Sequence, residues 1–176
     1  MQSVINSATH NAPKQAEEKY EEFGQPKIMV MGCGGAGCNA VNRLANMGIA
    51  GAQLVAINTD KQHLSIINDE ITKILIGKSV TRGLGAGGYP EIGAKAAEVS
   101  RQALEEVLAG VDMLFISAGM GGGTGTGSAP IVAEIAKSQG AIVIGLVTYP
   151  CTLERARTIK AEEGIQRLSE VCDTVI

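Results

Sequence analysis

The sequence predicts a doubly wound α/β fold, in which a mainly parallel six-stranded sheet carries helices on both of its faces. Short apolar runs rich in β-branched residues alternate with longer segments of helical periodicity, and these runs are apolar on both strand faces. Such strands are buried on both sides, and right-handed crossovers place helices on each side of the sheet. With 176 residues, 45% of them hydrophobic, the chain has material for one such domain.

The expected elements follow a polar N-terminal segment. Residues 1–26 include a charge-rich run and predict an N-terminal arm or a surface helix, whereas residues 27–176 form the domain. The expected strands cover residues 28–31, 53–57, 73–76, 112–117 and 141–147, and a last strand opens near Asp173. The expected helices cover residues 35–47, 90–108, 125–138 and 153–170. The helix over 90–108 is the clearest, because apolar residues recur at steps of three and four at Ile92, Ala96, Val99, Ala103 and Val107.

Composition excludes several classes of function. The net charge is −3 and the isoelectric point is about 5.4, which disfavours general binding of nucleic acid. Four cysteines follow no secretory signal, so we expect reduced thiols and not disulfides. The longest uncharged stretch, residues 113–133, has a glycine-dense centre and a proline, so no membrane span is expected.

Two glycine-rich loops each follow an expected strand and open an expected helix. Their candidate ligand-binding residues are Gly34, Gly35, Ala36, Gly37, Cys38 and Asn39 in the first loop, and Gly121, Gly122, Gly123, Thr124, Gly125 and Thr126 in the second. Glycine lets the backbone approach an anion, and the helix N-terminus offers free N–H groups. The commonest doubly wound strand order, 3-2-1-4-5-6, makes the first and fourth strands neighbours. Both loops therefore converge on one crevice and predict phosphate binding.

The phosphate site lacks basic side chains, because residues 28–42 and 113–133 contain no Lys or Arg. A bound polyphosphate would be neutralised by backbone amides, two helix dipoles, the hydroxyls of Thr124 and Thr126, and a Mg²⁺ ion held through the phosphates without protein ligands. Gly77-Lys78-Ser79 is similar to the end of a Walker A loop. The glycine required five residues earlier is Thr72, and no helix is expected to follow at once, so this motif is rejected.

Further candidates lie after the second, third and fifth strands. The glycine-rich loop over 81–90, with Ala86, Gly87 and Gly88, either closes on the outer phosphate or is an ordinary surface connection. Asn58 and Asp60 close the second strand. A dinucleotide-binding domain places a ribose-binding acid there, so NAD remains a candidate ligand, although Asp60 could equally be a helix N-cap ahead of Leu64.

The segment after the fifth strand offers charged side chains at the start of a helix. Glu154 could accept ribose hydroxyls, and Arg155 or Arg157 could reach phosphate or base; a solvated helix face is the alternative. His10 and His63 have no partners in the sequence, and nothing resembles a Ser-His-Asp set or paired acid and base carboxylates, so no catalytic group is expected from these side chains.

Taken together, these motifs resemble the tubulin/FtsZ family of GTPases, and within it the archaeal FtsZ type. Gly121–Gly127 matches the family signature, and Gly34–Asn39, Asn58–Asp60 and Ala86–Gly88 are similar to its other nucleotide loops, in the same order, over residues 27–176. The resemblance implies a Rossmann-like domain that binds GTP or GDP with Mg²⁺. It also implies a cytoplasmic protein that polymerises head to tail with its own copies, forms the cytokinetic ring at the division site and binds membrane-tethering proteins.

The resemblance also assigns roles to single residues. Residues 35–39 and 123–125 would hold the phosphates and part of the base, Ala86–Gly88 would sense the γ-phosphate, and Glu154 would bind ribose. The family often has an Arg four residues after that Glu, where this chain has Thr158, and Arg155 or Arg157 would substitute.

The resemblance implies no catalytic residue in this chain, because the family's hydrolytic acids come from a later part of a neighbouring subunit. We therefore expect the chain alone to bind nucleotide weakly and hydrolyse it poorly. Two alternatives remain open at this point. One is an NAD-binding oxidoreductase domain that uses Gly32, Gly34, Gly37 and Asp60, and the other is a filament component that binds nucleotide without turnover.

Overall fold

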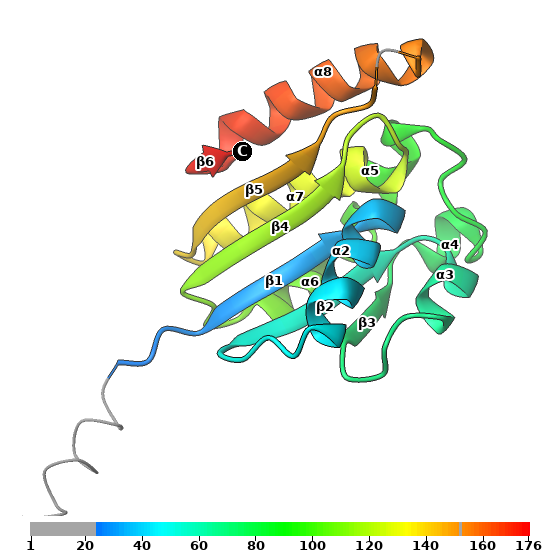
Figure 1. Cartoon of the computed structure of the whole chain (residues 1–176). Helices are drawn as coiled ribbons and strands as arrows, with labels where there is room; N and C mark the ends of the chain where they lie inside the picture. The colour runs from blue at the N-terminus through cyan, green and yellow to red at the C-terminus, as the bar shows by residue number, and fades with distance from the viewer. Residues whose placement is uncertain (1–23, 152) are drawn as a thin grey trace, which may run out of the picture.

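The computed structural model describes residues 24–151 and 153–176, and its centre is a six-stranded sheet in which every pairing is parallel (Figure 1). The strand order is β3-β2-β1-β4-β5-β6, which confirms the predicted order. The strands are β1 (Ile28–Cys33), β2 (Ala52–Asn58), β3 (Thr72–Leu75), β4 (Met113–Gly119), β5 (Ile142–Thr148) and β6 (Thr174–Val175). The prediction for residues 1–26 falls almost wholly outside the described residues.

Seven helices connect the strands in the described part of the chain. They are α2 (Gly34–Asn46), α3 (Lys61–Ser65), α4 (Lys78–Thr81), α5 (Pro90–Glu98), α6 (Arg101–Leu108), α7 (Thr124–Ser138) and α8 (Arg155–Val171). The short α4 was not expected, and α3 was expected only in the interpretation of Asp60 as a helix N-cap. The expectation that no helix follows Gly77 at once was wrong, because the single turn of α4 begins at the next residue. Gly77 has a left-handed conformation (φ 64°) that allows this abrupt start.

The single helix predicted over residues 90–108 is in fact two helices. The helical geometry is interrupted between Glu98 and Arg101. At this interruption the hydroxyl of Ser100 accepts a hydrogen bond of 2.9 Å from the backbone N–H of Gly77, in the turn after β3. The predicted apolar face was therefore partly wrong: Val99 is 53% exposed and Ala103 is exposed, whereas Ala96 and Leu104 are buried. Periodicity alone does not register a break that depends on a partner 23 residues away.

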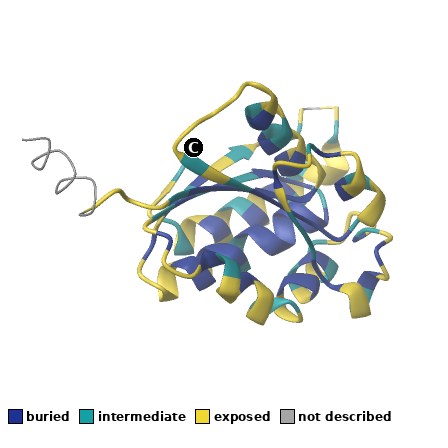
Figure 2. Ribbon diagram, turned by 90° about the horizontal axis from the view of Figure 1, so that it is seen from below, coloured by how far each residue is buried: buried dark blue, intermediate teal, exposed yellow. Residues whose placement is uncertain are grey.

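Helices cover both faces of the sheet, as predicted. Met29, Met31 and Cys33 of β1 join a core with buried residues of α5, α6, α7 and α8, whereas Val30 joins a second core with buried residues of α2 and α3. This is the two-residue alternation of a strand with two buried faces. Figure 2 shows the buried residues concentrated in the sheet and on the inner sides of the helices. In the described residues, no helix has the length and apolar character needed to cross a membrane.

The parallel arrangement places two helix N-termini at the same edge of the sheet. β1 runs directly into α2, and β4 is joined to α7 by four residues. β1 and β4 are hydrogen-bonded neighbours, with Cys33 opposite Ala118. The loops that follow these two strands therefore lie side by side at their carboxyl ends, where doubly wound folds bind ligands.

Candidate functional site

The two glycine loops lie in direct contact, which confirms the predicted convergence. A Cβ atom on Gly34 would lie 2.6 Å from the backbone nitrogen of Gly125, and one on Gly125 would lie 2.9 Å from the carbonyl oxygen of Cys33. Neither distance is available to a real side chain, so the absence of side chains lets the two backbones meet.

A cleft of about 330 Å³ opens where the loops meet. Its walls come from the β1–α2, β4–α7 and β5–α8 connections. Of the predicted site residues, it is lined by Gly35, Ala36, Gly122, Gly123, Thr124, Gly125, Glu154 and Arg157. The residues that sequence reasoning did not select as site residues are Cys33, Gly119, Met120, Thr148, Tyr149 and Pro150. These six flank the predicted motifs directly, at the ends of β1, β4 and β5, so strand-end position was the signal that could have found them.

Both helix N-termini at the cleft leave backbone N–H groups without a side-chain cap. The N-cap residues are Cys33 for α2 and Gly123 for α7, and neither makes a capping hydrogen bond. Neither helix has an acidic residue in its first turn. An uncapped helix N-terminus without a nearby carboxylate attracts anions through its N–H groups and its dipole.

Two glycines at the cleft have space around them. A Cβ on Gly35 would meet no atom within 4 Å, and one on Gly122 would meet only the carbonyl oxygen of Gly119, at 3.9 Å. The fold therefore does not require glycine at either position. Both residues line the cleft, so the missing side chains leave the backbone accessible to a ligand.

Hydroxyl groups hold the second loop in place. The hydroxyls of Thr59 and Thr124 are buried and hydrogen-bonded at 2.6 Å, which links the end of β2 to the start of α7. The hydroxyl oxygen of Thr126 accepts a hydrogen bond of 2.9 Å from the backbone N–H of Gly121. Sequence reasoning missed Thr59 as a positioning residue, although it lies between Asn58 and Asp60. A role of Thr126 as a phosphate ligand stays a prediction.

A histidine joins two of the predicted residues beside the first loop. Nδ1 of His63 lies 3.2 Å from Nδ2 of Asn58, and its Nε2 lies 3.1 Å from Oδ1 of Asn39. A neutral ring with its proton on Nε2 satisfies both contacts. The expectation that His63 lacks partners was therefore wrong, because its partners come from α2 and β2. None of these three side chains lines the cleft.

Asp60 lies at the N-terminus of α3. Its Oδ1 accepts hydrogen bonds from the backbone N–H groups of Gln62 (2.9 Å) and His63 (3.1 Å). This confirms the N-cap interpretation of Asp60. Its carboxylate is not among the groups that line the cleft.

The third glycine loop packs on the second. A Cβ on Gly123 would lie 2.9 Å from Cβ of Ala86 and 3.1 Å from the nitrogen of Gly88. Nζ of Lys160, on α8, donates a hydrogen bond of 2.7 Å to the carbonyl oxygen of Gly88 and lies 5.2 Å from the centroid of the Tyr89 ring. The cation therefore ties this loop to α8. No sequence signal could have paired Lys160 with a residue 72 positions away.

The β5–α8 connection supplies the charged side chains of the cleft. Nη1 of Arg157 donates a hydrogen bond of 2.7 Å to Oε2 of Glu154, and the Cys151 thiol donates to Oε1 of the same carboxylate at 3.4 Å. The Glu154 side chain is 40% exposed and that of Arg157 is 63% exposed. Arg157 lines the cleft, whereas Arg155 and Thr158 do not.

Two cysteines near the cleft, Cys33 and Cys38, are buried, and only Cys33 lines the cleft. Burial raises the pKa of the Cys33 thiol far above its ordinary value and that of Cys38 to about 12. Both thiols are therefore protonated and unreactive at neutral pH, and no cysteine pairs with another within residues 24–151 and 153–176. In the same residues no three His, Cys, Asp or Glu side chains gather into a metal site.

Comparison with known proteins identifies the family. Residues 27–176 match the family model described as the Tubulin/FtsZ family, GTPase domain. The chain is 66% identical over 156 residues to cell division protein FtsZ 2 of Methanocaldococcus jannaschii, covering 89% of this chain and 41% of that protein. It is 54% identical over 181 residues to cell division protein FtsZ 2 of Halobacterium salinarum, covering 100% of this chain and 46% of that protein.

Solved structures agree with this assignment. An empty FtsZ dimer from M. jannaschii superposes with a TM-score of 0.86 at 49% identity, over 93% of this chain and 48% of that one. A GTPγS-bound protofilament of CetZ2 from Haloferax volcanii gives a TM-score of 0.75 at 27% identity, over 85% of this chain and 48% of that one. The chain thus spans less than half the length of these relatives. On this evidence the chain belongs to the tubulin/FtsZ family, as a GTPase domain of the archaeal FtsZ type.

Proposed function

We propose that the cleft binds GTP or GDP through the backbone of its two glycine loops. The observation that carries the proposal is the meeting of two helix N-termini, both without caps and without acidic residues, at one cleft. The N–H groups of the first turns of α2 and α7 would hold the phosphates, with Gly35 and Gly122 leaving space for their oxygens. The family membership selects guanine nucleotide among phosphate ligands.

The residues present fit a Mg²⁺ ion only if phosphates supply its ligands. Glu154 is the one carboxylate that lines the cleft within the described residues, and it is paired with Arg157. Mg²⁺ commonly binds through phosphate oxygens and water with few protein ligands, so this donor set is compatible with a nucleotide-bound ion. When bound, the ion would neutralise phosphate charge that the loops, without Lys or Arg, leave unbalanced.

The remaining site residues take the roles that the family resemblance implies. Glu154 would accept the ribose hydroxyls, and Arg157, held beside it, would contact phosphate or base. Ala86–Gly88 would respond to the outer phosphate, since this segment already packs on Gly123. Asn39 and Asn58, held together by His63, would border the base side of the first loop.

We further infer that GTP hydrolysis needs a neighbouring subunit. With its single carboxylate engaged by Arg157, the cleft offers no acid within the described residues to position a water molecule. The relatives are named as cell division proteins, and related structures are described as a dimer and a protofilament. The proposal is therefore head-to-tail self-assembly into a cytokinetic ring, cytoplasmic at the division site, with membrane-tethering proteins as partners.

The NAD-binding alternative is weakened by the position of Asp60. In that reading its carboxylate would bind ribose, but it caps α3 and does not line the cleft. The filament component without turnover remains an outcome of the test below.

The test is calorimetric titration of the chain with GTP, ATP and NADH, each with and without Mg²⁺. We expect GTP to bind, with an affinity that rises with Mg²⁺, and ATP and NADH not to bind. Binding of NADH in place of GTP would overturn the proposal. A phosphate-release assay with bound GTP, in the chain and in assembled filaments, then separates a GTPase from a nucleotide-binding component without turnover.

A further inference from the structure

The sheet has an open edge on the side away from β6. β3 pairs with β2 and with no other strand in the described residues, and it lies beside α3 and α4 (Figure 1). A groove of about 600 Å³ runs along this edge and is separate from the nucleotide cleft. We call it the edge groove. It is lined by Leu64, Ser65 and Leu75 and by four cationic side chains, which are those of Lys61, Lys73, Lys78 and Arg82.

The outer edge of β3 presents backbone groups that can bind another strand. In a parallel ladder, alternate residues direct both their N–H and their C=O towards the same neighbour. Ile76 N–H donates to the carbonyl oxygen of Asn58 at 3.0 Å, so Ile74, two residues earlier, also faces β2. Lys73 and Leu75 therefore direct their N–H and C=O outward, as an unpaired strand edge does.

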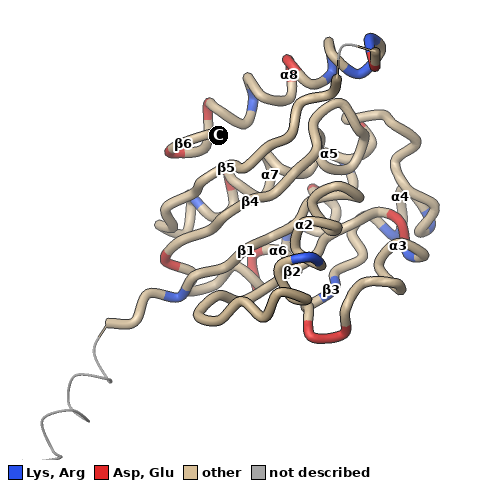
Figure 3. Tube along the Cα trace, in the orientation of Figure 1, with Lys and Arg blue, Asp and Glu red and all other residues tan. Residues whose placement is uncertain are grey.

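The rim of the groove carries positive charge in an acidic chain. Lys and Arg lie around α3 and α4, as Figure 3 shows. Lys73 is neutralised, because its Nζ contacts Oδ1 of Asp69 (2.7 Å) and the carbonyl oxygen of Ile67 (2.6 Å). Lys61, Lys78 and Arg82 form no ion pair with any described carboxylate. The surplus charge at this edge is opposite to the net charge of −3.

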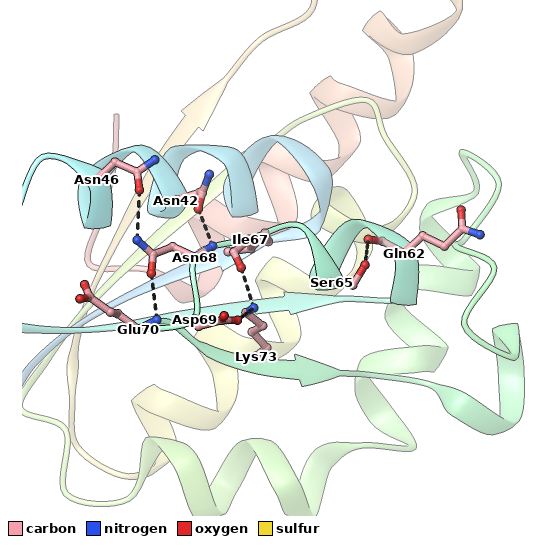
Figure 4. Close-up of polar contacts among 9 residues, drawn as sticks. All are labelled: Asn42, Asn46, Gln62, Ser65, Ile67, Asn68, Asp69, Glu70 and Lys73. Atoms are coloured by element: carbon pink, nitrogen blue, oxygen red, sulfur yellow. Dashed lines mark hydrogen bonds and ion pairs between the residues drawn. The ribbon is translucent and has the colours of Figure 1, made fainter.

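The loop that precedes β3 is held in place by side-chain amides (Figure 4). Asn42 of α2 accepts from the backbone N–H of Asn68 at 2.8 Å, and Asn46 accepts from its side-chain amide at 3.1 Å. Oδ1 of Asn68 in turn accepts from the N–H of Glu70 at 2.9 Å. The loop that contacts Lys73 through Ile67 and Asp69 is therefore fixed to α2.

Arg82 adopts a left-handed backbone conformation, which is unfavourable for residues other than glycine. Its φ is 56°, and it is the only residue other than glycine with a positive φ in the part of the chain that the structure describes. Its neighbours Gly83 and Gly85 adopt positive φ as glycines. Arg82 is the C-cap residue of α4, a position where a left-handed residue is common but is usually glycine, so arginine costs stability there. Its side chain lines the edge groove.

A second hollow lies on the opposite face of the same strand. Its volume is about 440 Å³. Its apolar lining consists of Ile74, Leu75, Val99 and Ala103, and its polar lining consists of Lys78, Ser79, Ser100, Gln102 and Glu106. Val99 is the apolar residue that the sequence predicted on the sheet but that the structure leaves 53% exposed. A strand added to β3 would direct alternate side chains into the edge groove and into this hollow.

We propose that the β3 edge binds an extended segment of a partner protein in which acidic and apolar residues alternate. The outward N–H and C=O groups of Lys73 and Leu75 pair with its backbone. Its acidic side chains lie on the edge-groove side, among Lys61, Lys78 and Arg82, and its apolar side chains enter the hollow beside Val99. Backbone pairing supplies affinity, and alternate pockets supply specificity, as in other cases of strand addition.

The test uses an acetylated, amidated octapeptide of alternating Glu and Val, a matched peptide of alternating Lys and Val, and NMR of the chain. We expect the acidic peptide to bind at least about tenfold more tightly and to slow amide hydrogen exchange at Lys73 and Leu75. Equal binding of the two peptides would overturn the proposal. Binding without protection of these two amides, or displacement of the peptide by GTP, would also overturn it.

Two variants and a control localise the effect. Lys78→Gln and Arg82→Gly should each weaken binding of the acidic peptide by about two- to fivefold, the range expected for loss of one exposed charge contact. Arg82→Gly also suits the positive φ, so the variant should be at least as stable as the parent and its weaker binding is not caused by unfolding. Arg167→Gln, on α8, removes an exposed cation remote from the groove and should bind as the parent does. Unchanged binding in both groove variants contradicts the proposal.

Discussion

In the first glycine loop, a Cβ on Gly37 would overlap the carbonyl oxygen of Ser117 in the adjacent strand β4. A Cβ on Gly34 would instead meet Gly125 and Thr124 of the second loop. In the second loop the glycines meet three further segments: Gly121 packs on Arg157 of α8, Gly123 on Ala86 and Gly88, and Gly127 on Pro90 of α5. The first loop is thus shaped by strand β4 and by the second loop, whereas the second loop also contacts α5, α8 and the third loop.

The difference separates two reasons for glycine that look identical in the sequence. Most glycines of both loops are required by the close approach of other backbone segments. Each loop also has one that is not: Gly35 in the first and Gly122 in the second are surrounded by open space and line the cleft. Fold and ligand binding should therefore respond to different substitutions, which makes the comparison testable.

The largest effect is expected where glycine is imposed by packing. Gly37→Ala and Gly127→Ala should each lose about 3 kcal/mol or more of unfolding free energy, because the new methyl group overlaps a carbonyl oxygen that belongs to another element. Gly35→Ala is the matched control. It lies in the first turn of α2 with space around it, so it should be as stable as the parent or gain about 0.5 kcal/mol. Urea unfolding measures all three, and parental stability in Gly37→Ala would refute the distinction.

The second largest effect is expected on ligand binding alone. Gly122→Ala should lower GTP affinity about ten- to a hundredfold, since a methyl group would stand where phosphate oxygens approach the backbone. The unfolding free energy should stay within about 0.5 kcal/mol of the parent. Calorimetry and urea unfolding on the same preparation separate the two quantities. Full GTP affinity in both Gly122→Ala and Gly35→Ala would mean that the cleft is not the phosphate site.

Much of the fold could be predicted from the sequence because its signals are local. Each strand is a short apolar run, and the glycine clusters mark the carboxyl ends of β1 and β4, so strand order and the meeting of the two loops followed from the rules of parallel sheets. The failures have a common physical cause. The break at Ser100, the contact of His63 with Asn39 and the attachment of Lys160 to Gly88 all depend on residues distant in sequence.

The candidate site shows the same limit more sharply. Motif spacing indicated which loops form the cleft, but not which of their residues face it. Cys38 and Thr126, for example, are buried beneath the surface, whereas Tyr149 and Pro150 line the cleft without belonging to a recognised motif. Nor could the sequence show which glycines are imposed by packing, because that depends on how closely other segments approach.

A smaller effect is expected from the hydroxyl pair that connects β2 to the second loop. Thr59→Val leaves the Thr124 hydroxyl buried without its 2.6 Å partner and should cost about 1 kcal/mol of unfolding free energy, and Thr124→Val should cost a similar amount. The double variant should lose clearly less than the sum, because no unpaired hydroxyl remains. Strictly additive losses in urea unfolding would show that the pair does not hold the loop.

The smallest effect is expected for substitution of Asp173, which is remote from both loops. This substitution tests whether the loops are energetically independent of the β6 edge of the sheet. Its carboxylate accepts from Nζ of Lys137 (2.7 Å) and from the N–H of Val143 (2.8 Å), and these contacts hold its pKa below the ordinary value. Because the pKa of Asp173 is lower in the folded state, its carboxylate contributes its full stabilisation at pH values above the unfolded-state pKa near 3.8. This stabilisation is lost as the pH falls through the lower folded-state pKa.

Asp173→Asn should therefore be slightly less stable than the parent at pH 7 in thermal unfolding, and the difference should shrink below about pH 4. GTP affinity at pH 7 should not change, and a loss of affinity in this variant would show that the second loop is coupled through α7 to the sheet edge.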